Sequence, residues 1–414
     1  MTSLIEFDNY NLHFHTSDKF KTFLFHINFI NEYDFKRLSV REAMLRLLFL
    51  NNKKYITSLD ISKKCEDLYD PYFYFEQYRM GKYVFSNIFI KFIDPKYVNE
   101  DDYFESIIEY YFDVIFNPNF SEESLLFVKN SITSDLYSIL DDPGRSSLLD
   151  FYSCLDKNDS RGVSLLGTIE DVNSITLYDI KSEYEKFINE SILEVSLVTD
   201  KYNKDYIDII NKYSKFNKNK KEKINPYRDT LNVNKEFVKE KDYSQSTLIM
   251  LYNFNDLTEK EKNITTLLFS EILGGYSVNA ILNTKLREEN SICYGVNSNY
   301  EKYDNSLRIF TSVSINNIDK AIELIKSTVN GFKSITEDDM NNAVKRLILS
   351  LKSSDNNIFS FAGEKLFTDL GIIYDSKKKE ECLKDITIDE VISILDKLEY
   401  NSCYILKGVK NEEN

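Results

Sequence analysis

The order of strand-like and helix-like segments occurs twice in this chain, with a period near 200 residues. Each half opens with strand patterns, continues with a run of helices, and closes with a buried apolar strand, at 192–200 in the first half and 402–408 in the second. Self-similarity on this scale marks a repeated structural unit, and runs of strands followed by runs of helices are typical of α+β domains. The sequence therefore predicts two similar α+β domains, each a mostly antiparallel sheet packed with helices.

Periodicity places the elements of the first half. Apolar and polar residues alternate in places over 9–32, which predicts two strands of a hairpin, and strand signals return over 75–94. The spacing of apolar residues predicts helices over 39–51, 57–68, 101–116, 121–140 and 175–188. Breakers at Asn117-Pro118-Asn119 and at Asp141-Asp142-Pro143-Gly144 end two of these helices.

The second half repeats this order. We expect strands over 246–254 and within 292–315, and helices over 258–272, 277–289, 318–332 and 336–351. The stretch 211–229 is polar and lysine-dense, which is typical of a solvated connector, although a basic docking patch is an alternative interpretation. We therefore divide the chain into a first domain at 1–200, a linker at 201–230 and a second domain at 231–414.

The formal charge of the chain is −15 at pH 7. Nucleic-acid binding needs a basic face that displaces counterions from phosphates, so we expect no nucleic-acid partner. The acidity would suit a basic peptide substrate, but a solvated acidic surface is the simpler reading.

The five cysteines are scattered and none forms a C-x-x-C pair, so the sequence indicates neither a disulfide framework nor a thiolate metal site. The N-terminus has no basic segment followed by an apolar run. No apolar stretch approaches the ~20 residues that span a bilayer. We expect a soluble, cytoplasmic protein without a membrane partner.

The sharpest motif lies at 271–296, where Gly274 and Gly275 precede a helical pattern that ends near Arg287 and Tyr294. Glycines allow positive φ and close backbone approach, and they also cap helices, so the pair has two possible roles. Taken alone, Arg287 could be a surface residue paired with Glu288, and Tyr294 could pack at the start of a strand.

The motif resembles a pattern of the insulinase/pitrilysin-type family of inverted zinc peptidases: L-G-G, then L-R-E-x-x-x-x-x-Y about ten residues later. Leu273-Gly274-Gly275 and Leu286-Arg287-Glu288 through Tyr294 match it. Weaker similarities at 47–55, 112–120 and 167–180 extend the resemblance over nearly the whole chain. It implies a short bacterial two-domain member, whose two domains form one half of a clamshell. It also implies that Arg287 and Tyr294 bind substrate and stabilise the transition state, beside the substrate-binding glycines Gly274 and Gly275.

Active members of this family carry H-x-x-E-H, in which two histidines bind zinc and the glutamate activates water, with a distant glutamate as third protein ligand. In this chain the corresponding positions are Glu42, Leu45 and Arg46, and the distal ligand falls near 123–128. A leucine cannot act as a base, and a cation at a ligand position repels the metal. We therefore expect no zinc in this chain and no hydrolase activity of the chain alone.

Other nucleophilic or metal chemistry has little support in the sequence. His13 and His15 share one face of a predicted strand and His26 falls on the next strand, but no carboxylate stands at a matching spacing, so exposed or hydrogen-bonded strand histidines are the simpler reading. Ser277 and Cys293 have no nearby histidine to activate them.

The resemblance therefore implies the zinc-free subunit of a heterodimeric metallopeptidase. A homologous partner would supply the zinc, and this chain would supply Arg287 and Tyr294 toward a peptide substrate. The alternatives are a non-catalytic pseudo-peptidase that binds peptides or scaffolds a peptide maturation pathway, and a purely structural subunit.

Overall fold

The structure, a computed structural model, describes residues 2–219, 221–275 and 277–409. The chain forms two compact units, each assembled from three stretches of sequence. The first unit comprises Met1–Ser138, Val163–Asn225 and Asp355–Ile372. The second comprises Ile139–Gly162, Pro226–Ser354 and Ile373–Asn414. In these described stretches no helix is both long and apolar enough to cross a bilayer.

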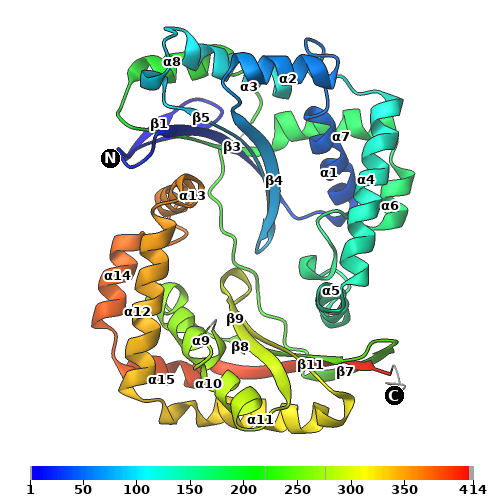
Figure 1. Ribbon diagram of the computed structural model, residues 1–414, viewed down its shortest axis with the longest axis vertical. Helices are drawn as coiled ribbons and strands as arrows, with labels where there is room; N and C mark the ends of the chain where they lie inside the picture. The colour runs from blue at the N-terminus through cyan, green and yellow to red at the C-terminus, as the bar shows by residue number, and fades with distance from the viewer. Residues whose placement is uncertain (1, 220, 276, 410–414) are drawn as a thin grey trace. The chain divides into compact units, whose positions relative to one another are not determined.

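The first unit, whose strands β1, β3, β4 and β5 are labelled in Figure 1, contains a six-stranded sheet. The strand order is β1-β2-β6-β3-β5-β4. Its strands are β1 (Thr2–Glu6), β2 (Asn11–Thr16), β3 (Thr22–Glu32), β4 (Tyr72–Met80), β5 (Tyr83–Ile93) and β6 (Ile192–Thr199). All neighbouring pairs are antiparallel except β2 and β6, which run parallel. The predicted antiparallel character of the sheet is confirmed.

The predicted hairpin over 9–32 is wrong in one respect. Both strands form, but β6 lies between β2 and β3, so that His13 and His26 each lie opposite Ser196. Every residue of β6 is buried, as expected of a central strand. Alternation within a segment identifies a strand but not its neighbour, which is why the sequence could not place β6 there.

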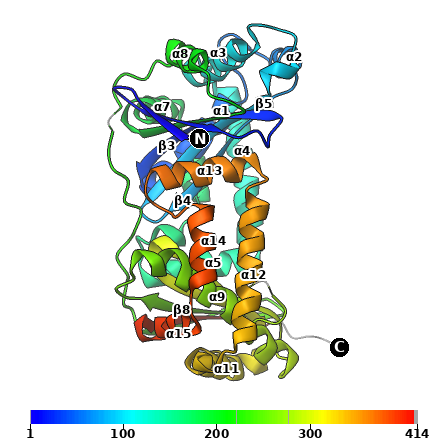
Figure 2. The same ribbon diagram turned by 90° about the vertical axis from the view of Figure 1, so that its left-hand side faces the viewer.

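The two faces of this sheet bury different helices. Phe25 and Ile90 pack with Tyr111 of α3, whereas Leu24 and Phe89 face the opposite side and pack against α13. Figure 2 shows α13, which comes from late in the sequence, lying along the early strands. The helices of this unit are α1 (Leu38–Leu48), α2 (Ser58–Asp67), α3 (Tyr103–Phe116), α4 (Glu122–Asp141), α6 (Ile169–Ser174), α7 (Leu177–Glu190), α8 (Lys204–Tyr213) and α13 (Ile358–Asp369).

The second unit repeats the arrangement in a five-stranded sheet of order β7-β11-β8-β10-β9. Its strands are β7 (Lys235–Lys241), β8 (Ser246–Phe254), β9 (Cys293–Glu301), β10 (Ser306–Val313) and β11 (Leu398–Gly408). β7 and β11 pair in parallel, as β2 and β6 do in the first unit, and the other pairs are antiparallel. The order therefore matches β2-β6-β3-β5-β4 strand for strand, and the predicted pair of similar α+β folds is confirmed.

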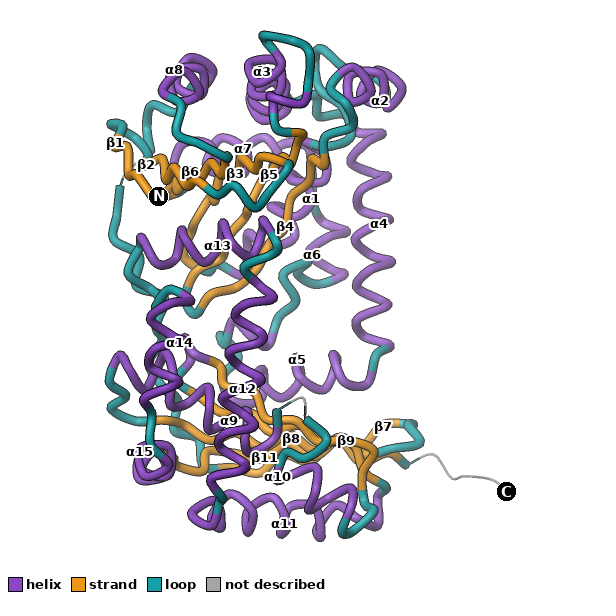
Figure 3. Tube along the Cα trace, turned by 60° about the vertical axis from the view of Figure 1, so that its left-hand side comes forward, coloured by secondary structure: helices purple, strands orange, loops and turns teal. Residues whose placement is uncertain are grey.

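This second sheet also buries helices on both faces. Leu248 and Met250 point into one core, and Ile249 and Leu251 point into another with Phe151 of α5. Figure 3 shows α5 beside this sheet, although its sequence belongs to the first half of the chain. The helices of the unit are α5 (Pro143–Leu155), α9 (Thr266–Gly274), α10 (Ile281–Asn283), α11 (Ile318–Asn330), α12 (Glu337–Ser354), α14 (Ser376–Asp385) and α15 (Ile388–Ser393).

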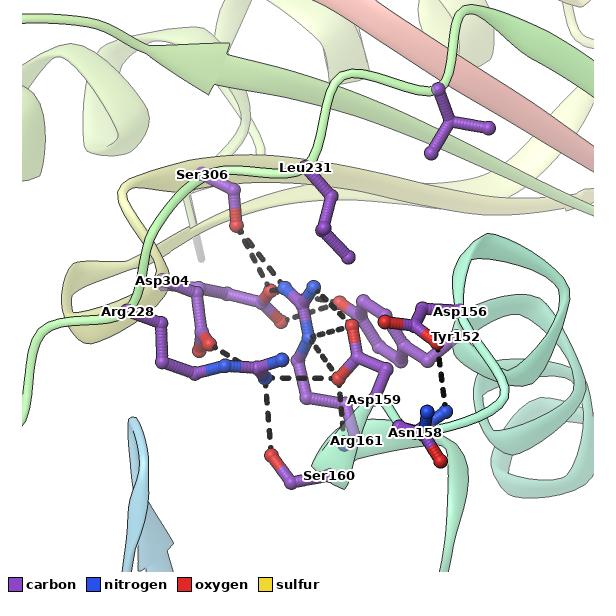
Figure 4. Close-up of polar contacts among 12 residues, drawn as sticks. Tyr152, Asp156, Asn158, Asp159, Ser160, Arg161, Arg228, Leu231, Asp304 and Ser306 are labelled. Atoms are coloured by element: carbon purple, nitrogen blue, oxygen red, sulfur yellow. Dashed lines mark hydrogen bonds and ion pairs between the residues drawn. The ribbon is translucent and has the colours of Figure 1, made fainter.

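A buried ion network fastens the turn after α5 to the second sheet (Figure 4). The carboxylate of Asp159 is fully buried and pairs with Arg161 at 2.7 Å and with Arg228 at 2.9 Å. Arg161 also reaches Glu301 at 3.0 Å, and Arg228 reaches Asp304 at 3.2 Å. Burial alone would raise the pKa of Asp159, but its hydrogen bonds to Arg161 and the charges of both arginines lower it from 3.8 to about 2.

Replacement of Asp159 by asparagine should destabilise the second unit. Asp159→Asn leaves two buried guanidinium groups with one carboxylate each, and we expect a loss of about 2–3 kcal/mol in the free energy of unfolding. Because the pKa of Asp159 is depressed in the folded state, its ionised carboxylate stabilises the fold at pH values above the ordinary aspartate pKa. Wild type should lose this stabilisation as pH falls from about 4 to about 2, and the variant should not. Urea unfolding at several pH values measures both effects. Glu399→Gln, at an exposed position, should change stability by less than about 0.5 kcal/mol; equal losses for the two variants would contradict this account.

Candidate functional site

The positions that correspond to the family's zinc motif lie on α1. Leu45 is fully buried in the first core with Ala43 and Met44, so the position of the general base points away from solvent. Glu42 and Arg46 are one helical turn apart, and the Arg46 Nε atom donates to Glu42 Oε1 at 2.8 Å. These residues do not fit a zinc ion, because the only carboxylate among the three is already engaged by the guanidinium.

Arg46 is held by two further elements. Its Nη1 atom donates to Ser131 Oγ at 2.7 Å and its Nη2 atom to Asp135 Oδ2 at 2.8 Å, both on α4. The second oxygen of Glu42 accepts from Gln77 Nε2 of β4 at 2.7 Å. Burial lowers the pKa of Arg46, but the hydrogen bonds and charges of Glu42 and Asp135 outweigh it, so the pKa stays above its ordinary value. The guanidinium is permanently charged and joins α1 to α4.

The sequence did not single out Ser131 and Asp135. They lie one and two turns beyond the stretch 123–128, where we expected a counterpart of the distal zinc ligand. Their spacing of four residues on a predicted helix places both on one face, and this was the available signal. Nothing in the sequence indicated that Arg46 lies opposite that face.

A cavity of about 520 Å³ opens beside this network, between α1, α4 and β4. We call it the α1–β4 cavity. Most of its lining is apolar or aromatic, with a few polar and charged groups at Glu42, Arg46, Glu76, Gln77, Ser131 and Asp135. The apolar and aromatic lining consists of Phe49, Leu50, Tyr74, Phe75, Phe127, Val128, Leu165 and Leu166. The cavity lies wholly within the first unit.

Arg287 and Tyr294 lie in the second unit. Arg287 is in the π-helical segment Thr284–Glu288, its side chain is half exposed, and its Nε atom lies 3.3 Å from Glu288 Oε1. Burial raises the pKa of the Cys293 thiol, and the charge of Arg287 acts in the opposite direction. Arg287 is thus electrostatically close to the residue that precedes Tyr294.

Tyr294 is presented to solvent by a break in the strand ladder. Cys293 pairs with Val313 and Val296 with Thr311, so Tyr294 and Gly295 stand opposite the single residue Ser312. This is a β-bulge, a feature that re-aims side chains and is frequent at sheet edges and next to active sites. β9 is an edge strand, and Tyr294 is 85% exposed. The phenol is free to meet a ligand rather than packed at the strand start.

The two glycines end α9, and Gly274 allows β9 to approach it. The N–H of Gly275 donates to Glu271 O at 3.1 Å, so Gly275 caps the helix, with φ of −68°. A Cβ atom on Gly274 would lie 2.9 Å from the backbone nitrogen of Ser298. The close backbone approach that glycine permits is therefore between Gly274 of α9 and β9 of the same unit. Both glycines also line a pocket of about 150 Å³.

Of the simpler readings, exposed or hydrogen-bonded strand histidines, the structure shows the hydrogen-bonded one at His13. His13 and His15 are buried, and His13 lies between two carboxylates, Glu194 at 2.8 Å and Asp369 at 3.0 Å. Burial lowers the pKa of His13, but the hydrogen bonds to Asp369 and Glu194 and the charges of these carboxylates together raise it by more, so the net shift is upward. These carboxylates lie 181 and 356 residues away in sequence, which hid them from spacing arguments. Among the described residues no group of three or more His, Cys, Asp or Glu is placed to hold a metal ion.

Comparison with known proteins supports the resemblance seen in the sequence. Residues 174–347 match the family described as peptidase M16 inactive domain. The chain is 21% identical over 310 residues to a probable inactive metalloprotease, YmfF, of Bacillus subtilis, covering 72% of each protein.

Solved structures support the fold. A conserved protein from Enterococcus faecalis is similar over 100% of both chains, with a TM-score of 0.92 and 17% identity. A peptidase M16 inactive domain from Pseudomonas fluorescens is similar over 98% of both chains, with a TM-score of 0.79 and 14% identity.

Substitution of Gly274 should separate the packing role of this residue from helix propensity. In Gly274→Ala the new methyl group meets backbone of β9 that cannot move aside, and we expect a loss of about 1–3 kcal/mol in the free energy of unfolding. Gly363→Ala is the matched control, because Gly363 lies within α13 and a Cβ there meets nothing within 4 Å. It should leave stability unchanged or raise it by up to about 1 kcal/mol. Denaturant unfolding checks both, and a neutral Gly274→Ala would remove the close-approach argument.

The two arginines should respond differently to removal of their charge. Arg46→Met leaves the buried Glu42 with Gln77 as its remaining partner, so we expect a loss of about 1–2 kcal/mol in the free energy of unfolding. Arg287→Met removes a half-exposed ion pair and should cost less than about 0.5 kcal/mol. Thermal and urea unfolding distinguish the two. The reverse order would mean that Arg287, not Arg46, is the structural cation.

Proposed function

We propose that the chain, of which residues 174–347 match the family described as peptidase M16 inactive domain, is the zinc-free subunit of a two-protein peptidase. A homologous partner with an intact H-x-x-E-H motif supplies the metal and the general base. This chain contributes Arg287 and Tyr294 to the cleavage of a peptide. We place this heterodimer in the cytoplasm, in keeping with five cysteines that form no disulfide.

The observation that carries the proposal is the presentation of Tyr294. A tyrosine that is 85% exposed on a bulge of an edge strand has no packing role, so its hydroxyl is available to donate to a ligand. Arg287 is close in sequence and half exposed, and it adds a fixed positive charge. Donors of this kind stabilise the negative charge that develops on a carbonyl oxygen during acyl transfer.

The roles of the two side chains follow from their chemistry. The Tyr294 hydroxyl donates a hydrogen bond to the oxyanion of the tetrahedral intermediate. The guanidinium of Arg287 holds a backbone carbonyl of the substrate and so orients the peptide. Gly274 keeps β9 close to α9, so that these groups stay in place, and Gly275 caps the helix.

A second candidate is a pseudo-peptidase that binds a peptide without supporting its cleavage, as a scaffold in a maturation or modification pathway. The α1–β4 cavity favours this alternative, because it is a lined site that does not involve Arg287 or Tyr294. Under this reading substrate binding persists and turnover with any partner is absent.

Reconstitution with the partner tests the main proposal. We expect Arg287→Ala and Tyr294→Phe each to lower peptide cleavage by the assembled pair by about 10²–10³-fold, because each removes one donor to developing charge, while assembly stays intact. Chromatography measures assembly and a peptide-cleavage assay with and without chelator measures turnover. Tyr178→Phe, at a tyrosine that is 79% exposed on α7, is the matched control and should have no effect. Stoichiometric zinc and cleavage by the single chain would disprove the proposal.

A further inference from the structure

We propose that a cavity between α13 and the first sheet binds a small neutral aromatic molecule, of the size of phenol, that carries one O–H or N–H donor. We call it the α13 cavity; it has a volume of about 190 Å³ and is lined by residues of β3, β4, β5 and α13. It lies within the first unit, on the face of the sheet opposite α1. The inference goes beyond the proposed function and does not rest on it.

A buried histidine supplies the polar end of the α13 cavity. His26 lines the cavity and is 4% exposed, and its Nε2 atom has no hydrogen-bond partner among the described residues. A buried polar atom without a partner costs free energy that a bound ligand recovers when it supplies the missing hydrogen bond. Nε2 is therefore the atom to which we assign the polar group of the ligand.

A neighbouring asparagine determines which hydrogen bond His26 offers. Asn87 Nδ2 donates to the Glu76 carboxylate at 3.3 Å, so the Asn87 amide oxygen, 3.2 Å from His26 Nδ1, accepts the proton of that nitrogen. Asn28 Nδ2 also lies 3.2 Å from Nδ1, but its amide is oriented only by the uncharged Tyr78 hydroxyl, 3.4 Å from Asn28 Oδ1. Burial lowers the pKa of His26 to about 4, so the ring is neutral near pH 7. Nε2 is then an acceptor and selects a donor.

The apolar walls of the α13 cavity select an aromatic ring. Phe89, Phe359 and Phe367 line it, and the rings of Phe89 and Phe359 pack edge to face with centroids 5.1 Å apart. A further ring packs favourably against aromatic neighbours of this kind. A cavity of about 150 Å³ holds benzene, so about 190 Å³ accommodates one ring with one or two further atoms and excludes a peptide unit.

The charges around the cavity exclude an ion. Of the described residues that line it, Glu76 alone carries a charge, and this carboxylate repels an anion. Glu76 is also exposed and already accepts from Asn87, so a buried cation would be incompletely paired. A neutral molecule avoids both costs.

Two small residues of α13 leave the space open. Ala362 and Gly363 line the cavity, and a Cβ atom on Gly363 would meet nothing within 4 Å. Glycine is unfavourable in the interior of a helix, so this position is not explained by helix propensity. A larger side chain at Ala362, which is buried against the sheet, would occupy the place that we assign to the ligand.

Binding of small probes to the full chain tests the inference. Isothermal titration calorimetry compares phenol with toluene, which has the same ring and similar size but no donor, and with N-acetyltyrosinamide, which carries the phenol on a peptide unit. We expect phenol to bind with a dissociation constant of about 1 mM or below, about fivefold tighter than the more apolar toluene. N-acetyltyrosinamide should bind about tenfold more weakly than phenol, because the peptide unit does not fit.

Variants locate the site. His26→Phe keeps a ring but removes the acceptor, so it should weaken phenol binding about tenfold and leave toluene binding unchanged or improved. His15→Phe is the matched control and should leave phenol affinity unchanged, because His15 is a buried strand histidine outside the cavity lining. Ala362→Leu fills the cavity and should abolish binding of both probes. Urea unfolding verifies that each variant is folded.

Nuclear magnetic resonance gives a readout that needs no substitution at the site. The chain has three histidines, so its imidazole nitrogen resonances are few. Phenol should shift the Nε2 resonance of His26 and leave those of His13 and His15 in place. This measurement tests the inference even if His26→Phe does not fold.

Three outcomes would overturn the inference. No binding at about 10 mM phenol would mean that the cavity holds water only. Tighter binding of toluene than of phenol would mean that His26 Nε2 contributes no hydrogen bond. Equal affinity for N-acetyltyrosinamide would mean that the site takes a side chain of a peptide instead of a free small molecule.

Discussion

The ion pair between Glu42 and Arg46 is the interaction on which the first unit's site depends. It joins α1 to α4 through Ser131 and Asp135 and to β4 through Gln77. A metal-binding helix of this fold would need neutral imidazoles and a free carboxylate here. This chain places a fixed organic cation and its counterions there instead, and these groups pack α1 against α4 and β4. A cavity with carboxylates in its lining lies beside these groups.

The internal repeat places the two candidate sites at equivalent positions in the two units. In the first unit α1 follows β3, and in the second unit α9 follows the equivalent strand β8. The next strand along the chain, β4 or β9, lies at the edge of its sheet. These elements are α1 and β4 in the first unit and α9 and β9 in the second. The first pair carries the α1–β4 cavity, and the second carries the glycine cap and the bulge at Tyr294. The two units thus present an edge strand beside a helix at equivalent positions, with different side chains at each.

Much of the fold could be predicted because its signals are local. The helical spacing at 39–51 and 101–116 and the buried run at 246–254 identify α1, α3 and β8. Three features could not be predicted: the docking of α5 and α13 on sheets formed by the other half of the sequence, the insertion of β6, and the carboxylates around His13. The apolar face of a helix indicates that the helix packs against something, but it does not indicate against which sheet. The glycine after Tyr294 was the one local sign of the bulge.

The central claim is that Tyr294 meets the substrate in a shared site whose metal belongs to a partner. Photo-crosslinking from position 294 in the reconstituted pair tests this most directly, with a photoreactive phenylalanine analogue in place of Tyr294. The account predicts that irradiation labels a bound peptide near its cleavage site only when the zinc-bearing partner is present. Labelling no stronger than from the same analogue at Tyr178, or labelling that does not depend on the partner, would contradict it.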